Sequence, residues 1–372
     1  MMDSEEIIKL GHVIPIIIAL CGTMDFFTRF LPVNLFSARA WECVGRFPIA
    51  EGPFTPSFRY HNDRSCGDLA LMGNLPAYRV YRPETFTTNA SGFRKNPTED
   101  TTRPPDILMT GDSFAAGCGV NDDETLTVQL EGLTHRRIYN AGYMKIDLMR
   151  ILRRIDQLHM VSGIVILQYL ERYSVVPIQD LGYTSKETLN RWDRLHKIVD
   201  KSWEGFWQVS PVQILSQRLY RRLLNDRILP NTNAAKVVLG TLKNGRPILF
   251  FSLEAERFKQ PPENIDLSGI LKLQWELRQR HIDLLMVLTP DKYSVYAGLL
   301  AQPPVHVPNP PYLDRLSKML EQAHVPAVNL LSVLQNQAAS DLNQGVYIYW
   351  LDDTHWNARG IRVAAEEIRK HL

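Results

Sequence analysis

The sequence has little of what marks metal-binding, disulfide-rich or nucleic-acid-binding proteins. It holds only 4 cysteines in 372 residues, and no two of them form a C-x-x-C pair. This spacing argues against a structural zinc site. Its 42 basic and 40 acidic side chains leave a net charge of +2, so the charge balance does not favour a nucleic-acid partner. Cys43 and Cys66 could pair in an oxidising compartment or remain buried thiols, and the sequence leaves both open.

A long uninterrupted apolar run is also missing. The apolar stretch at 13–24 is broken by Asp25 and continues from 26 to 36, whereas a spanning helix needs about 20 apolar residues. The leading MMDSEE is acidic, unlike the basic start of a secretory signal. We expect residues 1–36 to form a membrane anchor, and the alternative is a buried amphipathic helix.

The remainder divides into three parts. Residues 37–105 are rich in aromatics, proline and glycine and lack a helical period, which predicts an irregular β and loop extension. From 106 to 372, strand-like and helix-like stretches alternate, with strands at 106–110, 136–142, 163–170, 282–290 and 326–331 and helices at 125–133, 146–158, 267–281, 311–324 and 358–372. This alternation predicts an α/β domain with a doubly wound parallel sheet of about five strands. Basic amphipathic helices interrupt it at about 177–262, as an insertion.

The stretch ILMTGDSFAAGCGV (107–120) places Ser113 directly after the first predicted strand of this sheet. Ligands of open parallel sheets bind beyond the carboxyl ends of the strands. A serine in this place could be a nucleophile on a tight turn, with its amide at a helix start where an oxyanion would sit. Alone, Gly-Asp-Ser is more simply a helix cap, because serine needs a neighbouring base to be nucleophilic.

The stretch YWLDDTHWNARG (349–360) supplies a base. His355 follows Asp352 by three residues and Asp353 by two, on a loop before the last helix. An adjacent aspartate can orient an imidazole and stabilise its cation. Because this loop is expected at the same rim of the sheet as Ser113, the three residue types form a self-consistent triad.

These two stretches and four others, TTNASGFR (87–94), RRIYNAG (136–142), VILQYLERY (165–173) and VLTPDKYSVY (287–296), resemble the SGNH, or GDSL-type, hydrolase superfamily. Within it the chain is most similar to the branch of bacterial alginate O-acetyltransferase-like proteins. The resemblance implies a three-layer, flavodoxin-like sandwich. In the alginate enzymes the Asp-His element precedes the serine, whereas here it follows, as in other SGNH hydrolases.

The resemblance implies Ser113 as the nucleophile and His355 as the general acid and base. Asp353 matches the D-T-H-W pattern of the branch and Asp352 matches the D-x-x-H spacing of the superfamily, so both stay candidates for orienting the histidine, with a preference for Asp353. The oxyanion hole would use the amides of Ser113 and of a residue after the second strand, where Lys145 stands in place of the usual glycine and Gly142 is a nearby substitute.

The third block departs from the superfamily, since QYLERY replaces its usual asparagine turn. Gln168, Glu171 or Arg172 from this block is therefore expected to line the site. The residues expected to contact substrate are Asp112, Gln168, Arg172, Lys292 and Tyr293. For Lys292 and Tyr293, a structural role in the loop is the alternative. Arg172 has the alternative role of pairing with a carboxylate near the rim. Cys118 is read as a packing residue, not a nucleophile.

The resemblance implies an esterase or O-acyltransferase that moves acyl groups, acetyl above all, on a cell-envelope polysaccharide or glycan, with no metal or organic cofactor. The expected partners are that glycan, a membrane-bound acyltransferase as acyl donor, and the membrane itself, with the domain on the periplasmic side. The alternatives are a non-catalytic, SGNH-like module that binds polysaccharide or scaffolds an export machine, and an esterase of small soluble esters.

Overall fold

The computed structural model describes residues 4–28, 51–73, 75–100, 102–143, 147–173, 212, 216 and 236–372. Most of the insertion expected at 177–262, Lys145 and Cys43 therefore lie outside the described residues.

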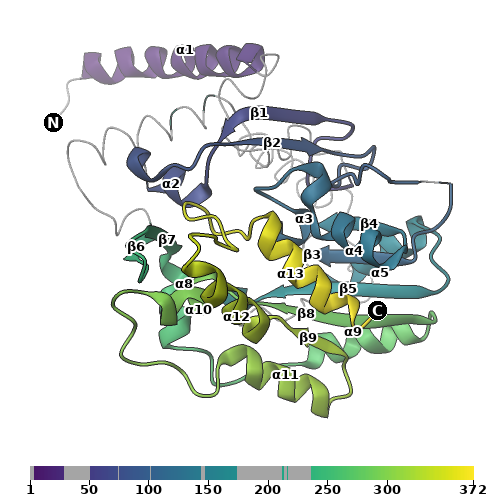
Figure 1. Cartoon of the computed structure of the whole chain (residues 1–372). Coiled ribbons are helices and arrows are strands. Elements are labelled where there is room, and N and C mark those ends of the chain that lie inside the picture. The colour runs from purple at the N-terminus through teal and green to yellow at the C-terminus, as the bar shows by residue number, and fades with distance from the viewer. Residues whose placement is uncertain are drawn as a thin grey trace.

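Five parallel strands form the central sheet, in the order β4-β3-β5-β8-β9 (Figure 1). They are β3 (Ile107–Gly111), β4 (Ile138–Gly142), β5 (Gly163–Leu170), β8 (Ile282–Thr289) and β9 (Ala327–Asn329). Their apolar sequences suit strands that are covered on both faces. The second strand in the chain lies at one edge and the first beside it, which is the flavodoxin-like order of doubly wound sheets. The predicted parallel sheet is confirmed.

Two sets of helices cover the two faces of the sheet. One core packs α4 (Leu126–Thr134), α10 (Lys292–Tyr296), α12 (Leu331–Leu342) and α13 (Ala358–Arg369) on side chains such as Met109 and Val287. The other packs α5 (Leu148–Gln157), α9 (Ser268–Arg278) and α11 (Tyr312–Gln322) on Leu108 and Met286. Successive strand residues thus alternate between the two cores.

Helix α12 was not expected from the sequence. The apolar run 326–331 was read as one strand, but β9 ends at Asn329 and Leu331 already begins α12. The side chain of Asn329 accepts a hydrogen bond from the Leu331 amide at 3.0 Å. This local bond turns the chain out of the extended conformation before the apolar run ends.

The extension before the sheet has more regular structure than predicted. Strands β1 (Arg59–Ser65) and β2 (Arg82–Thr87) pair antiparallel, and α2 (Asp68–Met72) and the short η3 (Pro76–Tyr78) lie between them. Figure 1 shows this unit above the end of the sheet where α3 (Ser113–Ala116) begins. A further antiparallel hairpin, β6 (Val237–Thr241) with β7 (Pro247–Phe251), leads into α8 (Ser252–Lys259).

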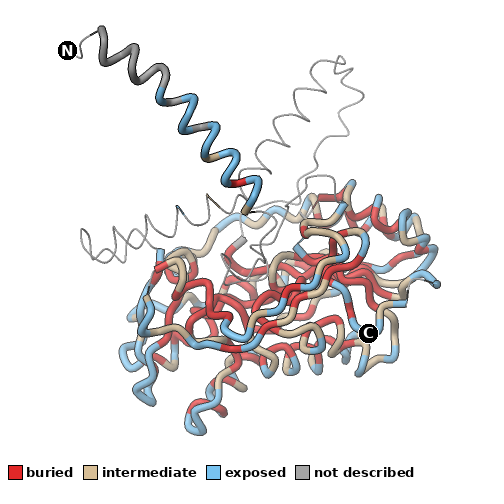
Figure 2. Tube along the Cα trace, turned by 90° about the horizontal axis from the view of Figure 1, so that it is seen from above, coloured by how far each residue is buried: buried red, intermediate tan, exposed pale blue. Residues whose placement is uncertain are grey.

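Helix α1 (Ser4–Thr28) carries an exposed apolar surface, including Ile16, Ile17, Leu20 and Phe27. Figure 2 shows most of its described residues exposed, in contrast to the buried sheet. Within the described residues, no helix combines the length and the apolar character needed to cross a membrane. The anchor expected at 1–36 stays a prediction.

Short 3-10 turns complete the described elements: η4 (Asp122–Glu124), η5 (Glu171–Tyr173) and η7 (Ala297–Leu299). Of these, η5 directly follows β5 and so brings Glu171 and Arg172 to the carboxyl edge of the sheet. This is the edge at which Ser113 follows β3.

Candidate active site

Ser113 stands at the first position of the four-residue helix α3, directly after β3. The Asp112 side chain caps this helix, with Oδ1 accepting a hydrogen bond from the Phe114 amide at 2.8 Å. Gly117 closes it with a left-handed φ of 74°, a conformation that suits glycine. Two tight turns therefore present the Ser113 side chain, half-buried, at the rim of the sheet.

His355 is held on a loop that closes on itself. Tyr349 and Trp356 form an isolated bridge, and the Trp350 amide donates to the His355 carbonyl at 3.2 Å. The imidazole packs on the Phe114 ring, with the two centroids 4.9 Å apart. Because Phe114 directly follows Ser113, this contact couples the histidine loop to the nucleophile turn.

The three residues meet across 242 positions of sequence. His355 Nε2 lies 2.7 Å from Ser113 Oγ, and His355 Nδ1 lies 2.6 Å from Asp353 Oδ1. Asp353 Oδ1 also accepts the His355 backbone amide at 3.1 Å. With a carboxylate on Nδ1, the ring carries its proton there and turns the lone pair of Nε2 toward the serine hydroxyl.

The two aspartates of the loop have different surroundings. Asp353 contacts the imidazole, whereas Asp352 points to the extension, where its Oδ2 accepts the amides of Gly67 at 2.7 Å and Val80 at 2.8 Å. A carboxylate that accepts two backbone amides anchors the loop to that extension. The geometry thus favours Asp353 as the orienting aspartate and gives Asp352 an anchoring position.

The charges of this site reinforce one another. Burial disfavours a charged His355, but the adjacent Asp353 carboxylate outweighs it and raises the pKa of the imidazole above its usual value. Burial likewise opposes ionisation of Asp353, yet His355 and Arg82 hold the pKa of its carboxyl well below the usual range. An ionised aspartate beside a histidine that can accept a proton is the electrostatic pattern of a general base.

The predicted oxyanion donors have different outcomes. Among the described residues, the Ser113 amide meets no acceptor and stays available at the start of α3. The Gly142 amide already donates to Asn140 Oδ1 at 2.9 Å. A Cβ on Gly142 would also collide with the Ala116 backbone. Gly142 is therefore a packing residue under α3, and Lys145 lies outside the described residues.

Asp112 and Gln168 support the nucleophile turn. Gln168 is fully buried, and its Oε1 accepts the Asp112 amide at 3.1 Å. Burial raises the pKa of the Asp112 carboxyl to about 6. Both side chains are thus engaged in shaping the turn from β3 into α3, and the buried Gln168 does not face substrate as expected.

Arg172 forms ion pairs with two buried carboxylates, Asp291 at 2.7 Å and Glu254 at 3.1 Å. This is the pairing role that the sequence left open as its alternative. Lys292 has no exposed surface, and its Nζ donates to the carbonyls of Trp350 at 3.0 Å and Asp353 at 2.6 Å. It braces the histidine loop from below rather than contacting substrate.

Tyr293 is 7% exposed and packs edge-on against the rings of Phe250 and Phe258. Its expected contact with substrate is not supported by this placement. Cys66 and Cys118 are both buried, and burial raises the pKa of the Cys118 thiol well above its usual value. A thiol held in its neutral form is a packing group, as expected for Cys118.

Sequence reasoning missed two charged residues of the extension that reach the histidine loop. Arg82 Nη2 donates to Asp353 Oδ2 at 2.9 Å, and Asp68 accepts two hydrogen bonds from Thr354. Both positions lie in a stretch read as irregular and neither is part of a quoted motif. The run of buried positions 65–70 beside a polar loop is visible only in three dimensions.

Asp68, Asp353 and His355 each offer one atom that could ligate a metal, and these atoms lie within 4.8 Å of one another. The same atoms are already hydrogen-bonded, Asp353 to the imidazole and to Arg82, and Asp68 to Thr354. A guanidinium on the carboxylate disfavours a second cation there. The arrangement fits proton transfer better than metal binding.

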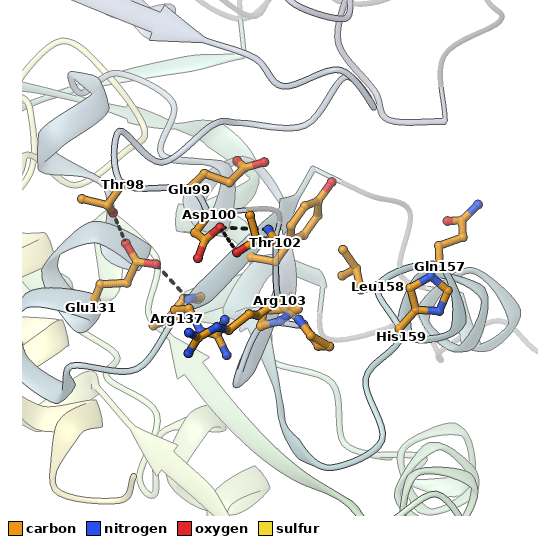
Figure 3. Close-up of a pocket in the computed structure, with 14 residues that line it drawn as sticks. Thr98, Glu99, Asp100, Thr102, Arg103, Glu131, Arg137, Gln157, Leu158 and His159 are labelled. Carbon is orange, nitrogen blue, oxygen red and sulfur yellow. Dashed lines mark hydrogen bonds between the residues drawn. The ribbon is translucent and has the colours of Figure 1, made fainter.

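Two cavities of the described residues lie away from the serine. One of about 300 Å³, lined by Thr98, Glu99, Asp100 and Arg137 among others, opens near the amino ends of β3 and β4, at the edge opposite Ser113 (Figure 3). Its Glu131 is occupied by the Thr98 hydroxyl at 2.8 Å. The other, about 150 Å³, includes Glu171 at the carboxyl edge. Neither contains Ser113 or His355.

Comparison with known proteins confirms the resemblance that the motifs predicted. Residues 249–372 match the family model described as "SGNH hydrolase-like domain, acetyltransferase AlgX". This third of the chain holds Asp353 and His355, and a domain of this kind indicates acyl esterase or acetyltransferase-type activity. Comparison with curated proteins finds no match.

Among solved structures, the chain is similar to a G-D-S-L family protein from Desulfitobacterium hafniense, described in its title as lipolytic. The identity is 12%, with 72% of this chain and 98% of the other covered and a TM-score of 0.33.

Proposed function

We propose that this protein transfers or hydrolyses acyl esters through Ser113, His355 and Asp353. The observation that carries the proposal is the hydrogen bond of 2.7 Å between Ser113 Oγ and His355 Nε2, in line with the 2.6 Å bond from Nδ1 to Asp353. Serine needs this kind of neighbouring base to act as a nucleophile. A structural cap would not require a histidine and a buried carboxylate behind it.

In the proposed reaction, Ser113 Oγ attacks the acyl carbonyl while its proton passes to His355 Nε2. The Ser113 amide donates to the oxyanion of the tetrahedral intermediate. The imidazolium, stabilised by Asp353, then gives its proton to the leaving alcohol, and an acyl-serine remains. In the second half, His355 takes a proton from water or a sugar hydroxyl as that oxygen attacks the acyl carbonyl. The imidazolium then returns the proton to Ser113 Oγ as the bond from this oxygen to the acyl carbon breaks.

For the substrate we propose acetyl groups on a cell-envelope polysaccharide, supported by the match of residues 249–372 to an acetyltransferase domain. Transfer requires an acyl donor, for which we propose a membrane-bound acyltransferase. We also propose that the chain lies at a membrane, on its periplasmic side. The exposed apolar surface of α1, with Ile17 and Leu20, supports contact with a membrane.

The proposal is tested by labelling the full chain with a fluorophosphonate probe, which reacts with activated serines. We expect the parent to label, and Ser113→Ala and His355→Ala to lose the label while keeping the thermal unfolding midpoint of the parent. A folded parent that does not label would overturn the proposal and favour the non-catalytic, glycan-binding alternative. Rapid turnover of small soluble esters without transfer to a sugar would point to the simple esterase.

A further inference from the structure

The histidine loop is held by a part of the chain nearly 300 positions away. Four amides of the extension donate to the loop. Those of Gly67 and Val80 bind Asp352 Oδ2, and that of Ala70 binds the Asp352 carbonyl at 3.1 Å. The amide of Asp68 binds Asp353 Oδ2 at 3.3 Å. A Cβ on Gly67 would collide with the Asp352 backbone. The two segments therefore touch main chain to main chain, which fixes the loop closely.

Arg82 binds both aspartates of the loop. Its Nη1 donates to Asp352 Oδ1 at 3.1 Å and its Nη2 to Asp353 Oδ2 at 2.9 Å. The guanidinium also stacks on the Trp350 ring, 4.1 Å from the centroid. This planar fork matches two carboxylates at once, which a lysine cannot do. Because Arg82 occupies Oδ2 of Asp353, Oδ1 is left to face the imidazole.

Asp68 acts on the imidazole through Thr354. Its Oδ1 accepts the Thr354 amide at 2.8 Å and its Oδ2 accepts the Thr354 hydroxyl at 2.7 Å. The Thr354 oxygen lies 3.2 Å from His355 Nδ1. A hydroxyl has one proton, and here the Asp68 carboxylate takes it. Toward Nδ1 the hydroxyl can therefore only accept.

The Asp353 carboxylate and the Thr354 oxygen both act as acceptors toward Nδ1, so both hydrogen bonds form only when that nitrogen carries a proton. The neutral ring is then restricted to the tautomer whose Nε2 can accept the proton of Ser113. Asp353 alone could orient the ring. A second acceptor at Nδ1 further disfavours a rotated ring in which Nδ1 would bind a group other than Asp353.

We infer that Asp68 and Arg82 are positioning residues of the active site, and that the extension before the sheet thereby contributes to the geometry of that site. Asp68 fixes the Thr354 hydroxyl as a second acceptor for His355 Nδ1, and Arg82 fixes the orienting carboxylate of Asp353. The inference rests on the proposed function, because it concerns the same Ser113 and His355.

The role of Asp68 can be measured through the pKa of His355, because that pKa depends on the charged groups around the imidazole. Asp353 and Asp68, whose Oδ2 lies 3.9 Å from Nδ1, favour the imidazolium, and Arg172 across the site opposes it. The Asp112 carboxyl also faces His355. Asp68→Asn keeps the size of the side chain and an acceptor for the Thr354 amide, but removes one negative charge. It therefore lowers the pKa of His355.

The experiment measures the rate of fluorophosphonate labelling from pH 5 to pH 9 for the parent, Asp68→Asn and Arg82→Gln. For Asp68→Asn we expect the acidic limb of the profile to move to lower pH and the plateau to fall by about tenfold, since the Nδ1 tautomer is less restricted. For Arg82→Gln we expect a loss of about 10²-fold. A merely structural role would lower labelling at every pH without moving the limb.

Asp63→Asn is the matched control, since Asp63 lies in the same extension with a side chain that is 85% exposed. It should label like the parent. The unfolding curve of Arg82→Gln shows whether that variant folds. If it does not, the pH profile of labelling for Asp68→Asn still tests the inference. A parent that labels, with an Asp68→Asn profile superimposable on it, would overturn this inference and leave the proposed function standing. A folded parent without label would overturn both.

Discussion

At the scale of single residues, the two adjacent aspartates of the loop make a direct comparison possible. Both are buried and both contact Arg82, but only Asp353 reaches the imidazole. Replacing either aspartate by asparagine therefore distinguishes the effect of losing the carboxylate at the imidazole from the effect of loosening the loop.

We expect Asp353→Asn to lower the labelling or turnover rate by about 10⁴-fold, because an amide can donate to Nδ1 and reverse the tautomer. It should also lower the pKa of His355 and shift the acidic limb downward, since the carboxylate is what raises that pKa. Rates across pH check both. Asp352→Asn should instead lower the thermal midpoint with a smaller effect on rate. Equal losses of rate in the two variants would contradict the assignment of Asp353.

The sequence points to site residues that lie within contiguous motifs, and it gives no signal for residues that reach the site only through packing. Ser113, Asp353 and His355 lie in two short motifs, each with its own local logic of turn and spacing. Arg82 and Asp68 carry no such signal, because their importance comes from a contact across about 270 to 290 positions of sequence. For Lys292 the sequence leaves substrate contact and a structural loop role open, because the burial of one lysine cannot be read from its neighbours in the sequence.

At the scale of secondary-structure elements, α3 depends on the end of the neighbouring strand β4. Gly142 closes β4, and its missing side chain leaves room for the backbone of Ala115 and Ala116. The short helix can therefore lie against the sheet with Ser113 at its start. The five strands were predictable because buried parallel strands are short apolar runs, whereas this contact between α3 and β4 was not.

We expect Gly142→Ala to lower both the thermal midpoint and the labelling rate, because the added Cβ must push α3 and its Ser113 away from the sheet. Overpacking of this kind costs about 1–3 kcal/mol. Gly132→Ala is the control, since Gly132 lies within α4 with open space around it. There, alanine should stabilise the helix by about 0.5–1 kcal/mol. Parent-like labelling in Gly142→Ala would show that α3 tolerates the displacement.

At the scale of the whole molecule, one buried cation joins three distant parts of the chain. Arg172 follows β5, Asp291 follows β8, and Glu254 comes from α8 after the second hairpin. Glu171 completes the cluster by accepting the Asp291 amide at 2.9 Å. Burial raises the pKa of Glu171 and of Glu254 to about 8.

Carboxyls whose pKa is raised on folding bind more protons in the folded chain, so the cluster makes the parent less stable as pH rises from about 4.5 to about 8. Without Arg172, the carboxyls of Asp291 and Glu254 must either stay protonated or become negatively charged without the guanidinium that now pairs with them. We expect Arg172→Met to lower the free energy of unfolding by about 3–5 kcal/mol at alkaline pH and by less at pH 6, where protons take the place of the cation. Unfolding curves at both pH values check this.

The control for that experiment is Arg280→Met. The Arg280–Asp156 pair has side chains that are 36% and 62% exposed, so its loss should cost about 1 kcal/mol or less, with no dependence on pH. A similar pH-independent loss in both variants would contradict the role given to the buried carboxyls.

The contact between the extension and the histidine loop can form only late in synthesis of the chain, because the two segments lie far apart in the sequence. A ribosome makes the N-terminal part of a chain first, so Arg82 and Asp68 leave it long before their partners at 352–354 exist. During that interval the extension holds charged side chains without their partners, and the sheet has Ser113 without a base. A nascent chain of this protein should therefore not react with a fluorophosphonate probe until the segment at 352–355 has been made and has folded onto the extension.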